Sequence, residues 1–538
     1  MESPGYEPVE GGDWGLVSRL VLHRKGEAPA GMVMVAGGPR TAPGPAMDLP
    51  DFWIDRYEVT NREFKRFVDA GGYQTSDFWT QPFVLDGRPI AWNVAMARLR
   101  DQTGRPGPAT WALGTFPDGQ ADFPVSGVSW YEASAFAAFA GKVLPTLAHW
   151  QTAAGTRDAT VIAFSNFSNK GPAAAGATRD IGPYGTYQMT GNVKEWASTT
   201  TGELRYILGG AWNEATYLAV QPDAQAPFER RDTNGFRCVK YLSAPPAGVF
   251  AEVPRPAAGI ASRTPVSDAE FALYRRMYGY DQTALSARVE ATEETEHWRR
   301  ERASFAAAYG TDRVVAQLYL PKNVTPPYQA VIWFGGGDVI DMPTSDRPGT
   351  QFLFDFIIRT GRAVVLPVFN GTFERRLPPT AMRGRNALRE LGIERSQDLW
   401  RTIDYLETRP DIDRTRVAFY ALSYGATTGL VLIPLEPRIK AAVLLSTGLS
   451  GGTPAPERDP VNFAPRQRIP TLMINGHDDF LFLVDSQQKP LFNLLGAPRD
   501  QKKHLILDGV GHMPPPRADV IREVLEWFDT YLGPVERR

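Results

Sequence analysis

A serine, an acidic pair and a histidine in the second half of the chain have the types and order needed for attack on a carbonyl carbon. Ser423 stands between a short apolar run and the small residues that begin at Gly425, a pattern typical of a strand, a sharp turn and a helix. Downstream come Asp478 and Asp479 and then His512, each after another apolar run. An attacking serine needs a base and a group that orients the base, so these residues predict acyl transfer.

The chain order favours one assignment of roles. Four features each follow a predicted strand: a glycine-rich loop, a serine, an acid and a histidine. They come in the same order along the chain as the oxyanion loop and the catalytic triad of an α/β-hydrolase. His512 is the best-placed base, because the other histidines of this half precede the sheet, lie in a strand or sit beside the acid. Asp479 is the preferred acid because it comes three residues after Gly476, as in the G-x-x-D turn of that superfamily. Asp478 stays the alternative.

The oxyanion donors are expected from two backbone segments. One is the amide of Tyr424, directly after the serine, and the other is an amide of Gly336 or Gly337, at the end of a buried strand. Two plainer interpretations remain open, in which Tyr424 only lines the pocket and the glycines only form a turn. Ala421 occupies the position where the G-x-S-x-G pattern has glycine, a departure of one methyl group.

A mostly parallel sheet would position these residues. Residues 283–538 alternate strand and helix patterns, which predicts such a sheet with helices on both faces. The predicted strands are Ser304–Tyr309, Val314–Leu320, Ala330–Phe334, Ala363–Val368, Val417–Leu422, Ile439–Leu445, Thr471–Ile474 and His504–Leu507, the first two antiparallel. Helices are predicted at Arg395–Thr408 and Asp519–Leu532.

Length and composition limit the classes of function. At 538 residues the chain is expected to form two or three domains. A net charge of -2 without basic runs argues against nucleic acid as a partner, and no apolar run is long enough to span a membrane. The N-terminus has no secretory signal pattern, and the single cysteine excludes an internal disulfide and a zinc–thiolate cluster. We expect a cytoplasmic protein.

The predicted organisation has four parts. They are a lead-in at residues 1–30, a first domain at 31–242, a proline-rich linker with a docking helix at 243–282, and the hydrolase-like domain at 283–538. Within the first domain, Asn61 is predicted to cap a helix over Arg62–Ala70. Ser129 and Glu132 have the spacing of a capping box, with Ala140 expected to face inward. Ser267 is predicted to cap the docking helix.

The first domain resembles the formylglycine-generating-enzyme (sulfatase-modifying-factor) family. The resemblance lies in seven ordered motifs: Gly31–Val35, Phe52–Asn61, Phe123–Trp130, Ala140–Thr146, Gly191–Trp196, Gly209–Trp212 and Gly235–Cys238. It implies an α+β variant of the C-type-lectin-like fold. The copper-binding cysteine pair of catalytic members is absent, since Cys238 is the only cysteine, and two histidines before Gly235 are too few for the iron-dependent relatives. We therefore predict a catalytically silent domain, with Cys238 in its core.

The same resemblance implies a calcium site. The family's calcium-binding segment corresponds here to Gln188, Gly191, Val193 and Glu195, which would supply side-chain and backbone oxygens. The alternative is that Glu195 accepts hydrogen bonds from loop amides while the neighbouring Trp196 fills the core.

The second half resembles α/β-hydrolases of the dienelactone-hydrolase/prolyl-oligopeptidase-like group. The order of the two halves is similar to that in certain bacterial serine/threonine kinases, which carry a kinase domain first. Stretches similar to that group are Pro4–Glu10, Glu301–Gly310, Leu320–Asn323 and Phe492–Gly496. The kinase motifs themselves are absent, so the chain looks like the C-terminal part of such a protein.

The resulting hypothesis is a serine esterase that acts on a small-molecule ester. It needs no cofactor for catalysis, and calcium would be structural. Two alternatives remain, a non-catalytic binding or scaffold protein and a prolyl-type peptidase, because the latter uses the same triad. The sequence leaves the acyl length, the ligand of the first domain and the oligomeric state open.

Overall fold

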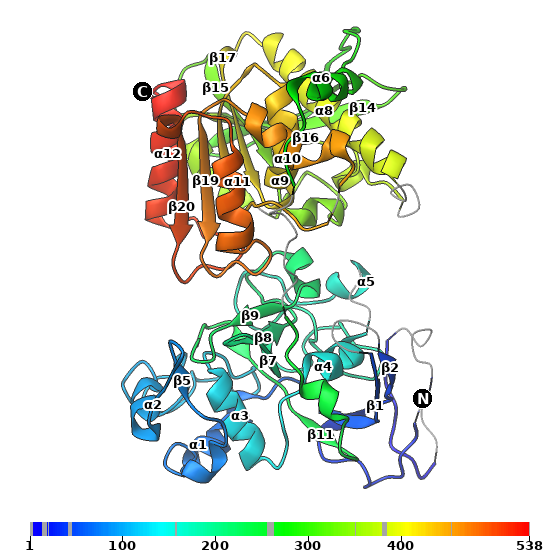
Figure 1. Ribbon diagram of the computed structural model, residues 1–538, viewed down its shortest axis with the longest axis vertical. Helices are drawn as coiled ribbons and strands as arrows, with labels where there is room; N and C mark the ends of the chain where they lie inside the picture. The colour runs from blue at the N-terminus through cyan, green and yellow to red at the C-terminus, as the bar shows by residue number, and fades with distance from the viewer. Residues whose placement is uncertain are drawn as a thin grey trace. The chain divides into compact units, whose positions relative to one another are not determined.

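The computed structural model describes residues 4–12, 19, 21–40, 46–155, 159–254, 263–349, 351–378, 385–452 and 454–536. The chain forms two compact units, Met1–Arg255 and Pro256–Arg538 (Figure 1). The division falls inside the predicted linker at 243–282, of which residues 255–262 lie outside the described residues.

The first unit combines small sheets with short helices. One described sheet has the order β1 (Met32–Val35), β4 (Phe52–Asp55) and β11 (Val239–Tyr241), and another has the order β10 (Asn234–Gly235), β7 (Lys194–Thr201), β8 (Leu204–Leu208) and β9 (Asp223–Gln225). Two-stranded pairs join β2 (Gly38–Arg40) to β3 (Met47–Leu49) and β5 (Val84–Leu85) to β6 (Arg88–Pro89). The helices are α1 (Asn61–Asp69), α2 (Trp92–Arg98), α3 (Trp130–Phe139), α4 (Leu147–Ala154) and α5 (Ala159–Ile162). This is the predicted α+β unit.

The helix caps of this unit differ in part from the prediction. Thr60, not Asn61, caps α1, because its extended backbone lets it form a reciprocal capping box with Glu63. Asn61 is instead buried and donates its side-chain amide to a backbone carbonyl. The predicted capping box of Ser129 at α3 is confirmed. Ala140 ends this helix at an exposed position, so its predicted inward orientation is wrong.

A buried ion pair connects several segments of the first unit. Glu195 accepts from Nη2 of Arg237 at 2.6 Å, from its Nε at 2.7 Å and from the Trp150 indole at 2.6 Å. Neither charged side chain is exposed by more than 1%, and the guanidinium also donates to backbone carbonyls at residues 55, 56 and 187. The next residue, Cys238, is fully buried as predicted, and burial raises the pKa of its thiol.

Within the described part of the second unit, nine strands form one sheet. Its order is β12 (Arg288–Glu294), β13 (Trp298–Ala306), β14 (Arg313–Pro321), β16 (Ala363–Val368), β15 (Tyr328–Phe334), β17 (Ile412–Leu422), β18 (Ile439–Leu445), β19 (Thr471–Gly476) and β20 (Lys502–Leu507). The pairs from β12 to β16 are antiparallel and all later pairs are parallel. This is the order and direction of an α/β-hydrolase sheet with one further strand, β12, at its antiparallel edge.

Helices cover both faces of this sheet. The helices are α6 (Asp268–Met277), α7 (Asp355–Arg359), α8 (Arg385–Glu407), α9 (Tyr424–Leu432), α10 (Pro460–Phe463), α11 (Lys489–Leu494) and α12 (Ala518–Leu532). In β17, Phe419 lies against Gly429 of α9, while the ring of Tyr420 lies 6.4 Å from that of Phe528 in α12. Adjacent residues of a strand point to opposite faces, so α9 and α12 cover opposite faces.

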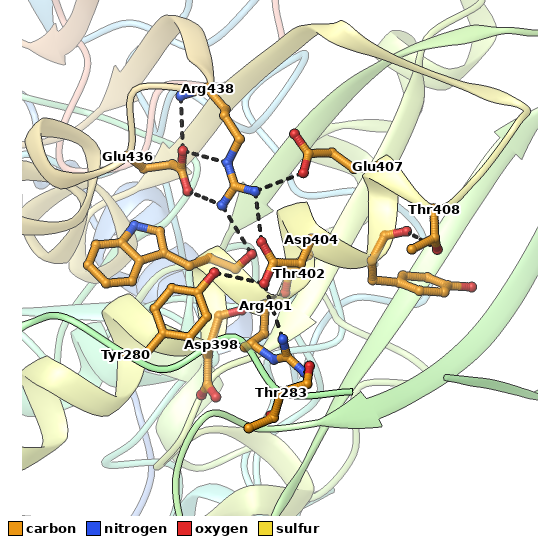
Figure 2. A network of polar contacts seen from close by, with 12 residues as sticks. Tyr280, Thr283, Asp398, Arg401, Thr402, Asp404, Glu407, Thr408, Glu436 and Arg438 are labelled. Atoms are coloured by element: carbon orange, nitrogen blue, oxygen red, sulfur yellow. Dashed lines mark hydrogen bonds and ion pairs between the residues drawn. The ribbon is translucent and has the colours of Figure 1, made fainter. Parts of the chain in front are cut away.

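The connector before the sheet packs on the second unit. Phe271 of α6 contacts Phe463 with ring centroids 5.1 Å apart, and Ser267 caps this helix as predicted. Further along, Tyr280 donates to Asp404 at 2.7 Å, and the carbonyl of Thr283 accepts from Arg401 at 3.0 Å (Figure 2). These contacts attach the connector to α8.

We expect Glu195→Gln to lower the free energy of unfolding of the first unit by about 3–5 kcal/mol, because it leaves the buried Arg237 cation without an anionic partner. Urea unfolding followed by tryptophan fluorescence measures the change. Asp122→Asn is the matched control, since Asp122 pairs with Arg62 on the surface, where side-chain exposures are 67% and 54%. Its expected effect is within about 0.5 kcal/mol. Equal effects of the two substitutions would contradict the structural role of the buried pair.

Candidate active site

Ser423 occupies a strained turn between β17 and α9. Its backbone has φ 48° and ψ −106°, a conformation that non-glycine residues rarely adopt. Its amide donates to the carbonyl of Leu445 in the neighbouring strand at 2.8 Å, which fixes the turn to the sheet. The serine side chain therefore stands at the carboxyl edge of the parallel strands, as the sequence predicts.

Gly425 explains how close this turn comes to the glycine-rich loop. A Cβ atom at this position would lie 2.4 Å from the carbonyl oxygen of Phe334 and 2.6 Å from that of Gly335. The Gly425 amide donates to the Gly335 carbonyl at 3.0 Å. Ala421 lies fully buried within β17, so the sheet accommodates the methyl group that departs from the G-x-S-x-G pattern.

The three residues proposed for acyl transfer form a continuous hydrogen-bonded chain. The Ser423 hydroxyl lies 2.7 Å from Nε2 of His512. Nδ1 of the same ring lies 2.9 and 3.0 Å from the two carboxylate oxygens of Asp479. All three residues are at most 5% exposed. This geometry matches a nucleophile, a base and an orienting acid.

The structure distinguishes between the two aspartates. Asp479 accepts from the amides of Leu481 and Phe482 at 2.8 and 3.0 Å, which hold its carboxylate toward the imidazole. Asp478 instead has a side-chain oxygen 3.0 Å from Nδ1 of the exposed His477. Asp479 is therefore the acid that reaches His512.

The expected oxyanion donors lie at the starts of two helical turns. Tyr424 is the first residue of α9, and Gly337 is the first residue of the 3₁₀ turn Gly337–Ile340, which Gly336 precedes in extended conformation. Backbone N–H groups at helix starts lack an acceptor within the helix. The Gly425–Gly335 hydrogen bond brings the two segments together. The oxyanion role of these amides stays a prediction.

Three residues near the site gave no functional signal in the sequence. Ser446, at φ 51°, donates its hydroxyl to the carbonyl of His512. Arg395 of α8 donates to the Tyr424 hydroxyl. Asp338 directly follows the glycine-rich loop, is 5% exposed, and has a carboxylate oxygen, Oδ1, without a hydrogen-bond partner. Burial raises the pKa of its carboxyl to about 6. Ser446 and Arg395 are ordinary polar residues whose partners are distant in sequence.

In this conformation, the side chains predicted to bind calcium have other polar partners. Both carboxylate oxygens of Glu195 accept from Arg237, so the only acidic ligand is already neutralised. Gln188 accepts from the Gly176 amide at 2.9 Å. The acceptor for the Val193 amide is Glu58, at 3.2 Å, rather than Glu195. Trp196 fills the core as the alternative interpretation expects. Calcium binding stays a prediction, which calorimetric titration would test.

The first unit is similar to proteins of known family. Residues 18–242 match the sulfatase-modifying factor enzyme 1-like domain, a match that begins within the predicted lead-in. The formylglycine-generating enzyme of Thermomonospora curvata is 30% identical over 32% of this chain and 72% of that protein. The hercynine oxygenase of Mycolicibacterium smegmatis is 29% identical over 32% of this chain and 48% of that protein. Serine/threonine-protein kinase pkn1 of Chlamydia pneumoniae is 26% identical over 45% of this chain and 40% of that protein. The chain thus spans about half the length of these last two relatives, or less.

Among solved structures, the chain is similar to the acetyl xylan esterase from Paenibacillus sp. R4, with a TM-score of 0.40, 17% identity, and coverage of 50% of this chain and 96% of that chain. The fold of the second unit is defined by its own strand order and by the turn at Ser423. None of the helices in the described residues has the length and apolar character to cross a membrane.

We expect Gly425→Ala to abolish activity and to destabilise the second unit by several kcal/mol, because the new methyl group meets backbone oxygens that cannot rotate away. Thermal unfolding and an ester-hydrolysis assay measure the two effects. Gly392→Ala is the matched control: it lies in α8, where the nearest atom to a new Cβ is a hydroxyl 3.9 Å away. This control should be neutral or slightly stabilising. An active, stable alanine variant at 425 would contradict the close approach.

Because the pKa of the buried Asp338 carboxyl is raised, we expect the protein to lose stability as the pH increases. The pKa of this carboxyl is about 6 in the folded chain against 3.8 for a solvated aspartate, so the unfolded state ionises first and stability falls as the pH rises from about 4 to about 6. The shift corresponds to at most about 3 kcal/mol. Asp338→Asn should therefore be more stable than the wild type at pH 8 and differ less at pH 5, as measured by thermal unfolding.

The control for this measurement is Asp508→Asn, which replaces an exposed carboxylate by a neutral amide. If the melting temperature of Asp338→Asn changes with pH in parallel with that of the wild type, ionisation of the Asp338 carboxyl does not lower the stability of the fold, and the prediction is wrong.

Proposed function

The chain belongs, through residues 18–242, to the family of sulfatase-modifying factor enzyme 1-like domains, and we propose that its chemistry lies in the other unit, which acts as a serine hydrolase of carboxylic esters. The observation that carries the proposal is the chain of hydrogen bonds from the Ser423 hydroxyl through His512 to Asp479. The position of Ser423 at a strained strand-to-helix turn supports the same assignment.

In the proposed mechanism, Ser423 Oγ attacks the ester carbonyl carbon while Nε2 of His512 takes the hydroxyl proton. The carbonyl π electrons move to oxygen, which accepts hydrogen bonds from the Tyr424 amide and from an amide of Gly336 or Gly337. The imidazolium then protonates the leaving alcohol, and the C–O bond to that alcohol breaks. Asp479 holds the ring and stabilises its charge.

Water completes the proposed cycle. His512 removes a proton from a water molecule as the water oxygen attacks the acyl-enzyme carbonyl, and it returns the proton to Ser423 Oγ as the acid product leaves. The cycle needs no metal ion or cofactor. The Tyr424 amide and the glycine-loop amide donate hydrogen bonds to the oxyanion in both tetrahedral intermediates, because the oxyanion forms at the same place during acylation and deacylation.

The first unit is proposed to take no part in bond making. Its single cysteine, Cys238, is fully buried against the core, and burial disfavours its thiolate form. The ion pair of Glu195 and Arg237 is buried within this unit. Binding of a ligand or partner is the role that such a unit retains.

Labelling with a fluorophosphonate probe tests the proposal directly. The wild type should be labelled and should hydrolyse short p-nitrophenyl esters, while Ser423→Ala should lose labelling and at least about 10⁴-fold in kcat/KM. Ser396→Ala is the matched control, because that buried hydroxyl donates only to a carbonyl of its own helix at 3.1 Å. Absence of labelling in a folded wild type would favour the binding-module alternative. Hydrolysis of aminoacyl-proline amides but not esters would favour the peptidase.

A further inference from the structure

One buried arginine beside the candidate site has no carboxylate partner. Four arginines in the described residues are at most 5% exposed: Arg237, Arg362, Arg395 and Arg401. Three of them form ion pairs, with Glu195, Asp529 and Asp404 respectively, and Arg395 forms none with a described residue. A buried cation without an anion is costly, because it loses hydration and gains no ionic partner.

The contacts of Arg395 fix the position of its guanidinium but leave one of its nitrogen atoms, Nη2, without an acceptor. Nε donates to the Asn370 carbonyl at 2.8 Å, Nη1 donates to the Tyr424 hydroxyl, and the guanidinium carbon lies 5.3 Å from the centroid of the same ring. The remaining nitrogen, Nη2, is buried and has no hydrogen-bond partner. The side chain is thus held in place by neutral groups, with an unused donor.

Nearby carboxylates are engaged elsewhere. Asp398 accepts from Arg375 at 2.7 Å and from the Asn370 amide at 2.8 Å. Glu394 accepts from the side-chain amide of Asn370 at 2.6 Å. The hydrogen bonds of these two carboxylates thus go to Arg375 and Asn370, and neither carboxylate forms an ion pair with Arg395.

Arg395 lies at the same edge of the sheet as the nucleophile. The loop that holds Nε follows β16, and Tyr424 follows Ser423 at the end of β17. Both strands are parallel to β15, which lies between them, so their carboxyl ends meet at one edge. The guanidinium contacts the side chain of Tyr424, the residue that directly follows Ser423.

We propose that Arg395 binds a carboxylate of the substrate, so that the second unit acts on esters that carry an acidic group several bonds from the scissile carbonyl. This proposal rests on the proposed function. The carboxylate accepts from Nη2 and neutralises the buried charge, an interaction stronger than a hydrogen bond between neutral groups. Arg395 is thereby a specificity-determining residue.

Matched pairs of substrates isolate the charge. Monomethyl and dimethyl esters of glutarate, adipate and suberate differ within each pair by one carboxylate, and the series varies its distance from the ester. The wild type should prefer the monomethyl ester by about 10- to 100-fold in kcat/KM at one or more chain lengths. Arg395→Gln should remove this preference, and Arg395→Lys should keep part of it because the positive charge remains.

Arg362→Gln is the matched control, a buried arginine whose partners Gln329, Asp529 and Gly533 lie at the opposite edge of the same sheet. It should keep the wild-type preference. Equal rates for each pair in the wild type, or an equal fall for both esters in Arg395→Gln, would overturn the proposal and leave Arg395 as a brace for Tyr424.

A binding measurement separates this proposal from the proposed function. Adipate should raise the melting temperature of Ser423→Ala, and the added substitution Arg395→Gln should remove that shift. If Ser423 is not labelled by the fluorophosphonate but adipate still binds through Arg395, the hydrolase assignment fails while the carboxylate site stands. If Ser423 is labelled but no dicarboxylate binds and no preference is seen, only the carboxylate site fails.

Discussion

The candidate site depends on one close approach between two backbone segments. The amide of Gly425 reaches the Gly335 carbonyl at 3.0 Å, and no side chain fits between them. This contact sets the distance between the helix start that follows Ser423 and the loop that carries Gly336 and Gly337. Because both segments end neighbouring parallel strands, the sheet holds the contact without help from flexible side chains.

Much of this arrangement could be predicted because it follows from local patterns. The bounds of β16 and β18 match the sequence prediction, and Ser423, Asp479 and His512 come together as their order implies. The strand β12 was missed because all seven of its residues are exposed, so it has no apolar alternation. The start of α8 was missed as well, since half of the residues in Arg385–Glu394 are polar and Gly392 lowers the helix propensity. Partners such as Arg395 and Tyr424 depend on packing between distant segments, which periodicity does not encode.

Buried charged groups are satisfied to different degrees within each unit. In the first, Arg237 and Glu195 satisfy each other, and the remaining guanidinium donors reach backbone carbonyls. That network is buried, and the residue after Arg237 is Cys238, the single cysteine of the chain. In the second, Asp338 and Arg395 each keep a buried polar atom without a hydrogen-bond partner, as Asp180 does in the first.

The helix α8 has a mechanical consequence for the site. At Arg401 and Asp404 it bonds the connector residues Thr283 and Tyr280, and at Arg395 it bonds Tyr424. These two sets of contacts are separated by about 9 to 14 Å of continuous helix. One continuous helix therefore carries both sets of contacts. Through it, the segment just before the sheet is connected to the tyrosine that directly follows Ser423.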